Sequence, residues 1–386
     1  MVMGMIISGV MLLEMLPFSV MVVMEGCTIA LTIWAKTAMT DYDMSPFVFV
    51  VYTQALSSIL LLLYSFIFHC RSRSTTQQSL FSFGLFVRCF LLGLTGITVS
   101  QNLAFLGLSY SSPILVCAMG LMLPTFSFLL SIILRRTKTD WRSSSFQAKV
   151  TGTIISIIGA VVVELYKGPY IRTSSVSSTS SSYLVLFEKA VQYFVFSSSA
   201  TEHWVLGGIL LAGASISVSV WNIIQMGTMK LYPEVVVMEV VSFYSLLGTI
   251  QCVILSLFIE RNNPSSWALK LNMDLLLIVL TACFGGLVRT RVHSWCINMK
   301  GTHYVPMFKP FGIVFATIFG VSLSANNLHY GSVLGAVVTG IGYFTIMWGQ
   351  IREDEDEQCV NETDQSILES TTSETKVPLL QEEIDV

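Results

Sequence analysis

The chain has 386 residues, of which 53% are hydrophobic and only 12% are charged, and its formal net charge is −3. Soluble domains carry roughly 25% charged residues, so this composition excludes an ordinary soluble fold of this length. Residues 1–350 hold 19 Lys and Arg against 12 Asp and Glu, whereas residues 351–386 hold 2 against 12, which predicts a membrane-embedded body followed by an acidic tail.

Apolar stretches of about 20 residues recur along the chain, and each is long enough to cross a bilayer as a helix. We expect ten such helices, near residues 17–38, 47–68, 85–105, 114–134, 148–166, 205–226, 235–259, 275–296, 305–323 and 332–348. A helix satisfies its own backbone groups where no water is available. The predicted fold class is therefore an all-α integral membrane protein.

The second half of the chain repeats features of the first half. Trp34 and Pro46 stand twelve positions apart at the first hairpin, and Trp221 and Pro233 have the same separation. Five helices are an odd number, so the second five must enter the membrane from the opposite side. The sequence thus predicts two inverted five-helix repeats, which are typical of secondary transporters.

Glycines mark the last helix of each half. Gly152 and Gly159 stand seven positions apart on one predicted helix face, and Gly335 and Gly342 repeat this spacing. Small residues let helix backbones approach each other closely in lipid. We therefore expect these two faces to take part in helix packing.

Five segments follow from the apolar stretches and the composition. They are an N-terminal segment (1–14), the first repeat (15–167), a Ser-rich loop (168–203), the second repeat (204–350) and an acidic tail (351–386). The N-terminal segment lacks the basic flank of a signal peptide, so we expect it to remain attached, poorly ordered or at the interface. The tail has too little apolar surface to fold alone and is predicted to be disordered.

Basic residues predict the orientation in the membrane. With both termini in the cytosol, the cytosolic connections and helix ends carry thirteen Lys and Arg, and the other side carries six. The bias stays eleven to six when Arg289 and Arg291, which fall inside a predicted span, are left out. Cytosolic loops are enriched in basic residues, so both termini are predicted to be cytosolic.

Polar side chains inside predicted spans are candidates for function, because they are costly in a membrane. Glu25 is either a proton-accepting or amine-binding carboxylate, or a structural group bonded to another helix. Gln101 and Asn102 form a polar patch that either binds substrate or joins helices. Asn222 and Gln225 lie on one helix face and suit a small polar ligand, beside a tryptophan that is also typical of a membrane interface.

Prolines and a lysine predict a broken helix in the ninth span. Lys309 is followed directly by Pro310, and Pro306 precedes it. Transporters often bind anions where a helix is broken beside a positive charge. Lys309 is therefore a candidate substrate-binding residue, with Pro306, Pro310 and the hairpin residue Pro113 as candidate gating positions. The alternative is a simple kink that lets Lys309 reach water.

Three further charged residues are candidates whose role the sequence leaves open. Arg289, Arg291 and the adjacent His293 alternate along the eighth span, so they cannot all face one cavity. One arginine could hold a carboxylate, or the span could be short with basic residues at its inner end. Glu239 lies about one turn into the seventh span.

No catalytic triad, metal-ligand spacing, phosphate loop or nucleic-acid motif stands out. The eight cysteines never show a Cys-x-x-Cys spacing. We therefore expect no enzymatic activity, no cofactor, no metal and no nucleic-acid partner. The expected partners are the lipid bilayer and a small-molecule substrate, with proton coupling as one option.

Nine short stretches from both halves form a recognisable set. They are Leu16–Glu25, Ser109–Pro113, Gln147–Ala160, Leu165–Pro169, Tyr232–Glu234, Ser266–Leu269, Met307–Pro310, Tyr330–Ala336 and Met347–Asp354. With them the chain resembles, over roughly residues 17–355, the plant Walls Are Thin-related (nodulin-like) transporters of the drug/metabolite transporter superfamily, which have EamA-type repeats.

This resemblance implies a ten-helix carrier of the plant plasma membrane or vacuolar membrane, associated with amino-acid export or auxin-related metabolites. It also implies a central cavity within reach of Glu25, Gln101, Asn102, Asn222 and Lys309. The chain departs from the family pattern at three places near this cavity. They are Lys300–Thr302 with the added Pro306, the charged Arg289 and Arg291, and Asn326–His329. Altered specificity or reduced activity is expected from them.

The sequence therefore predicts a secondary transporter of a small polar metabolite, an amino acid or a related organic acid or auxin-type compound, that works by alternating access. The alternative is a non-transporting membrane receptor or scaffold whose acidic tail recruits partners. Saturable flux distinguishes the two classes.

Overall fold

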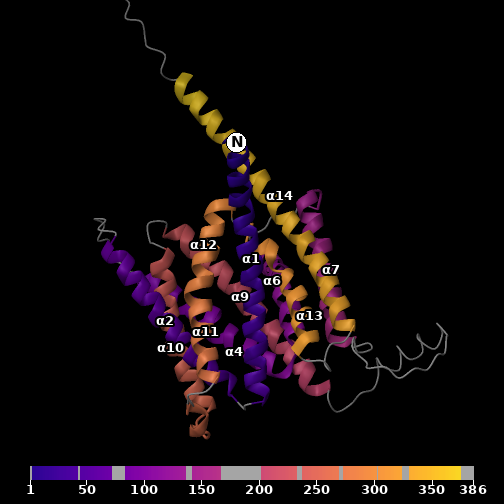
Figure 1. Ribbon diagram of the computed structural model, residues 1–386. Coiled ribbons are helices and arrows are strands. Elements are labelled where there is room, and N and C mark those ends of the chain that lie inside the picture. Colours follow the sequence, from indigo (N-terminus) through magenta and orange to yellow (C-terminus); the bar gives the residue numbers. More distant parts are fainter. Residues whose placement is uncertain are drawn as a thin grey trace, which may run out of the picture.

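The computed structural model of the protein describes residues 2–41, 44–71, 83–135, 141–166, 201–232, 237–268, 273–301, 303–323 and 330–374. Throughout these ranges the regular structure is helical and no strand occurs. The helices run side by side and form a bundle (Figure 1). This architecture agrees with the all-α membrane fold predicted from the apolar stretches.

The first half of the chain contributes seven described α-helices and one π-helical turn. They are α1 (Val2–Asp41), α2 (Pro46–Arg71), α3 (Phe83–Gly93), the π turn η1 (Leu94–Val99), α4 (Ser100–Tyr110), α5 (Pro113–Leu121), α6 (Leu123–Ile133) and α7 (Ser144–Leu165). The pieces α3, η1 and α4 follow one another directly and make one long span. Only Met122 separates α5 from α6, at the point where Pro124 lacks the N–H that would continue the helix.

The second half has a similar order of elements. They are α9 (Thr201–Leu231), α10 (Val237–Ile259), the 3₁₀ turn η2 (Pro264–Trp267), α11 (Met273–Ala282), the π turn η3 (Cys283–Val288), α12 (Arg289–Lys300), the 3₁₀ turn η4 (Pro306–Phe308), α13 (Phe311–Leu323) and α14 (Tyr330–Glu374). The pieces α11, η3 and α12 again make one long span.

Nine helical stretches in the described ranges are long and apolar enough to cross a membrane. The predicted span near residues 305–323 is shorter, because its apolar helical stretch covers only Pro306–Phe319. Pro306 and Pro310 interrupt the helix before α13 begins, since proline cannot donate a main-chain hydrogen bond. The structure thus describes a multi-span membrane protein with nine full-length spans where the sequence predicted ten.

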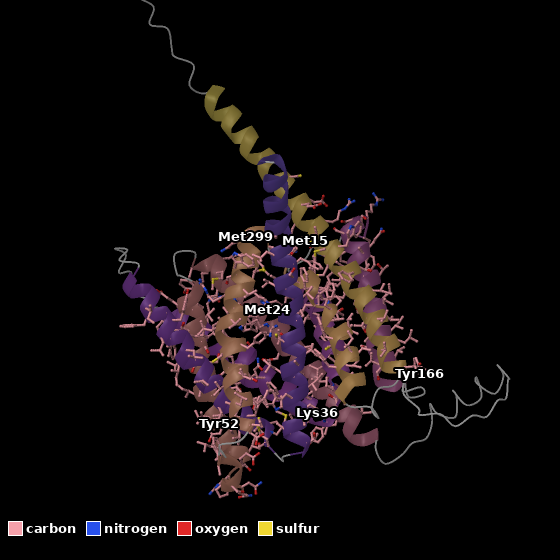
Figure 2. All side chains as sticks on the ribbon, in the orientation of Figure 1. Met15, Met24, Lys36, Tyr52, Tyr166 and Met299 are labelled. Atoms are coloured by element: carbon pink, nitrogen blue, oxygen red, sulfur yellow. The ribbon has the colours of Figure 1, made fainter. Side chains whose placement is uncertain are left out.

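The two ends of the bundle can be followed through labelled residues in Figure 2. Met15 and Met299 lie at one end, and Lys36, Tyr52 and Tyr166 lie at the other. The N-terminus and the far part of α14 both leave the bundle at the end that holds Met15 (Figure 1). We call these the Met15 end and the Lys36 end.

The acidic segment differs from its prediction. We expected residues 351–386 to be disordered, yet α14 continues without interruption to Glu374. The membrane-spanning part of α14 is already helical, so residues 351–374 can extend it without the cost of nucleating a new helix. Several of these residues are Glu and Gln, which favour the helix. The helix α1 likewise begins at Val2, inside the predicted N-terminal segment. The predicted Ser-rich loop (168–203) lies outside the described residues except for its last three, which begin α9. Pro233 and residues 375–386 also lie outside the described residues.

The two spans α7 and α14 pack closely through their glycines. Gly152 faces Gly342, and Gly159 faces Gly335, so the helices run antiparallel. A Cβ atom added at any of the four would come within 2.9 Å of the carbonyl oxygen of the facing glycine. The two small-residue faces predicted from the sequence therefore meet each other.

The spans α2 and α10 are joined by side-chain hydroxyl groups. Ser242, Thr249 and Ser256 stand seven positions apart on α10, and their hydroxyl groups lie 3.4, 3.3 and 3.3 Å from main-chain carbonyl oxygens of α2. Thr249 makes its shorter hydrogen bond, of 2.8 Å, to the carbonyl oxygen of Ser245 in its own helix. The hydroxyl groups are thereby satisfied in a region where water is absent.

Each half of the chain has its π turn in its third span. A π turn contains one residue more than an α-helical turn. The turn η1 packs against α10 and η3 packs against α2, which is a helix of the other half in both cases. Thr98 in η1 donates a hydrogen bond to Gln251 Oε1 of α10 at 2.9 Å. The irregular turns thus lie at the contact between the halves.

Candidate functional site

A carboxylate and an ammonium group form an ion pair inside the bundle. Lys309 Nζ lies 3.1 Å from Glu25 Oε1. The Glu25 side chain is 5% exposed and that of Lys309 is 28% exposed. Met24, the neighbour of Glu25, lies about midway between the two ends of the bundle (Figure 2). The pair therefore lies at a depth where an unpaired charge would be costly.

Aromatic packing holds the backbones that carry the two charges. The ring of Phe18 on α1 lies 5.4 Å from that of Phe308 in η4 and 6.3 Å from that of Phe311 in α13, between centroids. Farther along α1, a Cβ atom added at Gly26 would lie 3.3 Å from the ring of Phe315. The absence of a side chain at Gly26 thus lets α1 and α13 approach beside Glu25.

Lys309 lies between two helical pieces rather than within a helix. The turn η4 ends at Phe308, and α13 begins at Phe311. Pro310 has no N–H group, so the carbonyl group of Pro306, four residues earlier, cannot make its usual helical hydrogen bond. The sequence predicted this break from the two prolines, and the structure places Lys309 inside it.

A further positive group, Arg289, lies near the ion pair. Arg289 and His293 stand one turn apart on α12, and Arg289 is close enough to interact electrostatically with both His293 and Lys309. In the described part of the chain Arg289 forms no ion pair. Arg291 is directed elsewhere, with its guanidinium 5.0 Å from the centroid of the Tyr64 ring. The site therefore contains more cationic than anionic groups.

A third span approaches the ion pair through α5. Cys117 Sγ donates a weak hydrogen bond of 3.6 Å to the carbonyl oxygen of Gly312 in α13. A Cβ atom added at Gly312 would lie 3.9 Å from Glu25 Oε2. Helices α1, α5 and α13 therefore converge around the Glu25 carboxylate.

The predicted amide residues make no hydrogen bond with this pair among the described residues. Asn102 is 4% exposed, and its Nδ2 donates to the carbonyl oxygen of Thr98 at 2.7 Å and contacts Cys252 Sγ of α10 at 3.6 Å. Gln101, Asn222 and Gln225 are half-buried. Among the described residues no side-chain hydrogen bond joins any of these four amides to Glu25 or Lys309.

The remaining candidates have local roles in the structure. Pro113 is the first residue of α5, and Ser112 caps that helix by accepting a hydrogen bond from Leu115 N at 3.3 Å. Pro113 therefore begins a helix, where its missing N–H is harmless. Glu239 lies in the first turn of α10, where a negative charge is favourable. Thr302 and residues 326–329, which depart from the family pattern, lie outside the described residues.

Comparison with known proteins identifies the family. No family model matches the chain. It is 55% identical over 370 residues to a WAT1-related protein of Arabidopsis thaliana, covering 95% of this chain and 96% of the relative. The chain belongs to the WAT1-related family. A second WAT1-related protein of Arabidopsis thaliana is 52% identical over 94% of both chains, and a third is 37% identical over 88% of both.

The family and the helical bundle agree on the class of protein. A WAT1-related chain with nine full-length spans in its described part is a multi-pass membrane protein of the transporter type. The resemblance stated from the sequence motifs is thereby confirmed. The names of the relatives state no substrate.

Two residues near the pair escaped the sequence analysis. Tyr343 of α14 donates a hydrogen bond of 2.7 Å to the carbonyl oxygen of Pro306, and Cys117 contacts α13 beside Glu25. A tyrosine and a cysteine within apolar stretches give no signal by themselves, because both are common in buried cores. Only the WAT1-related fold brings them to the broken helix.

Proposed function

We propose that this WAT1-related protein is a secondary transporter that moves a small polar metabolite by alternating access. The observation that carries the proposal is the Glu25–Lys309 ion pair beside a broken helix about midway through the bundle. Secondary transporters place their binding sites near the membrane midplane at such breaks. The surplus positive charge of Lys309 and Arg289 favours a substrate that bears a carboxylate, such as an amino acid or a related organic acid or auxin-type compound.

The ion pair suggests how substrate binding is coupled to a second event. A buried charge is destabilising when it loses its partner. If Lys309 turns to the carboxylate of a substrate, the Glu25 carboxylate must be compensated as well. Either a proton or the amino group of the substrate can supply that compensation. Lys309 thus binds the acid group, and Glu25 takes up a proton or an amine.

Alternating access would take place between two inverted five-helix halves, with α13 counted as the ninth crossing. Three observations support this arrangement. The two α7–α14 glycine faces pack reciprocally, and the third span of each half contains a π turn at a matching place. In addition, both ends of the chain leave the bundle at the Met15 end, which requires an even number of crossings (Figure 1).

The Met15 end would face the cytosol of a plant cell, in the plasma membrane or the vacuolar membrane. The basic residues of the sequence support this orientation, because they are twice as frequent on that side. Epitope tags at the two termini, tested with antibody before and after selective permeabilisation, would locate them. Staining of intact cells would contradict the orientation.

Flux through reconstituted vesicles tests the proposal. The purified protein is assayed with a panel of radiolabelled amino acids and aromatic and aliphatic carboxylic acids. We expect saturable uptake of at least one carboxylate, and a loss of at least about tenfold in Glu25→Gln and Lys309→Met, because each removes a charge-assisted bond. The matched control is Glu353→Gln. It breaks the other described Lys–Glu ion pair, which Glu353 of α14 forms with Lys149 of α7.

The outcomes separate transport from the alternative class. Full uptake by Lys309→Met would remove Lys309 from the binding site. An equal loss in Glu353→Gln would show that any broken ion pair impairs the protein. A folded wild-type protein with no saturable flux for any compound in the panel would instead favour a receptor or scaffold.

A further inference from the structure

The two prolines of the broken helix leave a carbonyl group that another helix satisfies. The carbonyl oxygen of Pro306 would normally accept a hydrogen bond from residue 310, but Pro310 has no N–H. It accepts instead from the N–H of Lys309 at 3.1 Å and from the hydroxyl group of Tyr343 at 2.7 Å. The tyrosine bond is the shorter of the two. Tyr343 belongs to α14, so the turn that carries Lys309 is held from outside its own helix.

Tyr343 is itself fixed in place. Its side chain is 3% exposed and lies in the largest buried apolar cluster, together with Ile313 and Ala316 of α13. The helix that carries it packs closely along α7. A rigid ring with few rotatable bonds can therefore place its hydroxyl group with little freedom.

We propose that Tyr343 is a positioning residue that holds the η4 turn so that Lys309 faces Glu25 and, in the transport cycle, the substrate carboxylate. The expected effect on substrate binding rests on the proposed function. The position of Lys309 relative to Glu25 does not depend on transport. Tyr343 acts through the Pro306 carbonyl group and not on the substrate itself. The tyrosine thus links the regular α14 to the break that carries Lys309.

The test variant is Tyr343→Phe, which removes the hydroxyl group and keeps the ring in the apolar cluster. The matched control is Tyr52→Phe. Tyr52 also donates its hydroxyl group to a main-chain carbonyl, that of Trp267 at 2.8 Å, but it lies at the Lys36 end (Figure 2). The two variants each lose one hydrogen bond of the same chemical type, so a general loss of stability affects both.

Zero-length cross-linking measures the position of Lys309 without transport. A membrane-permeant carbodiimide joins a carboxylate to an amine in contact with it, forming an amide while the reagent takes up water as a urea. Peptide mass spectrometry then quantifies the Glu25–Lys309 amide relative to the Lys149–Glu353 amide in the same sample. We expect the ratio to fall severalfold in Tyr343→Phe and to stay unchanged in Tyr52→Phe.

The same variants are then compared in the flux assay. Loss of one hydrogen bond that positions the binding group should raise KM between about twofold and tenfold in Tyr343→Phe, with the maximal rate largely kept. An unchanged amide ratio in Tyr343→Phe, an equal fall in Tyr52→Phe, or no Glu25–Lys309 amide in the wild-type protein would overturn the positioning role. A wild-type protein without flux but with the expected amide ratios would refute only the proposed function.

Discussion

The contact between α7 and α14 predicts a specific response to added methyl groups. In Gly152→Ala the new Cβ atom would lie 2.8 Å from both Gly342 O and Ile346 N, which are main-chain atoms of α14. Ordinary contacts of a Cβ atom begin near 3.4 Å. Main-chain atoms cannot rotate away, so the two helices must separate by about 0.6 Å at this crossing.

That separation has a cost that can be estimated. A gap of 0.5–1 Å forfeits roughly a quarter to a half of the dispersion energy of each affected contact. Overpacking of a well-packed core costs typically 1–3 kcal/mol. We expect Gly152→Ala to lower the free energy of unfolding by about 2 kcal/mol. Gly342→Ala, at the facing position, should add less than its own single effect, because the first methyl group has already opened the crossing.

The assay is unfolding in mixed micelles, followed by tryptophan fluorescence as the denaturing detergent is increased. Gly120→Ala is the matched control, since Gly120 lies in the helix α5 and an added Cβ atom there would meet no atom within 4 Å. It should leave stability unchanged or raise it by up to about 1 kcal/mol, because alanine favours the helix. Wild-type stability in Gly152→Ala, or equal destabilisation by Gly120→Ala, would refute the reasoning.

Two further predictions use the same unfolding assay. Lys309→Met should destabilise the protein more than Glu25→Gln, because the carboxylate that it leaves unpaired is 5% exposed, whereas the Lys309 side chain is 28% exposed. Removing one partner of a buried ion pair costs up to about 3–5 kcal/mol of unfolding free energy. The double variant Glu25→Gln with Lys309→Met should recover part of this loss. Additive losses would contradict this coupling. Replacement of Ser242 or Ser256 by alanine should cost about 0.6 kcal/mol each, as for hydroxyl bonds between membrane helices. No loss in the double variant would show that these long bonds do not contribute.

The all-helical, multi-span character of the chain was predictable from the sequence, since apolar length and main-chain satisfaction leave few choices. The glycine spacing likewise pointed to the faces that α7 and α14 use. Pro306 and Pro310 predicted the interruption beside Lys309, because a missing N–H acts locally. Such features depend on residues close together in the chain.

Features that depend on distant residues were not predictable. Glu25 and Lys309 are 284 positions apart, so no periodicity could pair them. The π turns need an extra residue that only tertiary contacts, such as Thr98 with Gln251, can stabilise. The continuation of α14 beyond the membrane also escaped prediction, because composition describes a segment in isolation and takes no account of the helix that precedes it.

Regular and interrupted helices belong to different spans, and this division bears on the proposed transport cycle. The pairs α7–α14 and α2–α10 are held by contacts at the level of the main chain, and their membrane-spanning parts have no break. The interruptions η1, η3 and η4 all belong to other spans. At η4 the carbonyl group of Pro306 has lost its usual helical partner, so this turn can change shape at lower cost than an intact helix. Each regular pair joins one helix of the first half to one of the second, so in an alternating-access cycle these contacts would be the fixed points about which the halves move. Lys309, whose ammonium group contacts Glu25 and whose turn is held by the Tyr343 bond to Pro306, would be the charged group that can change its partner.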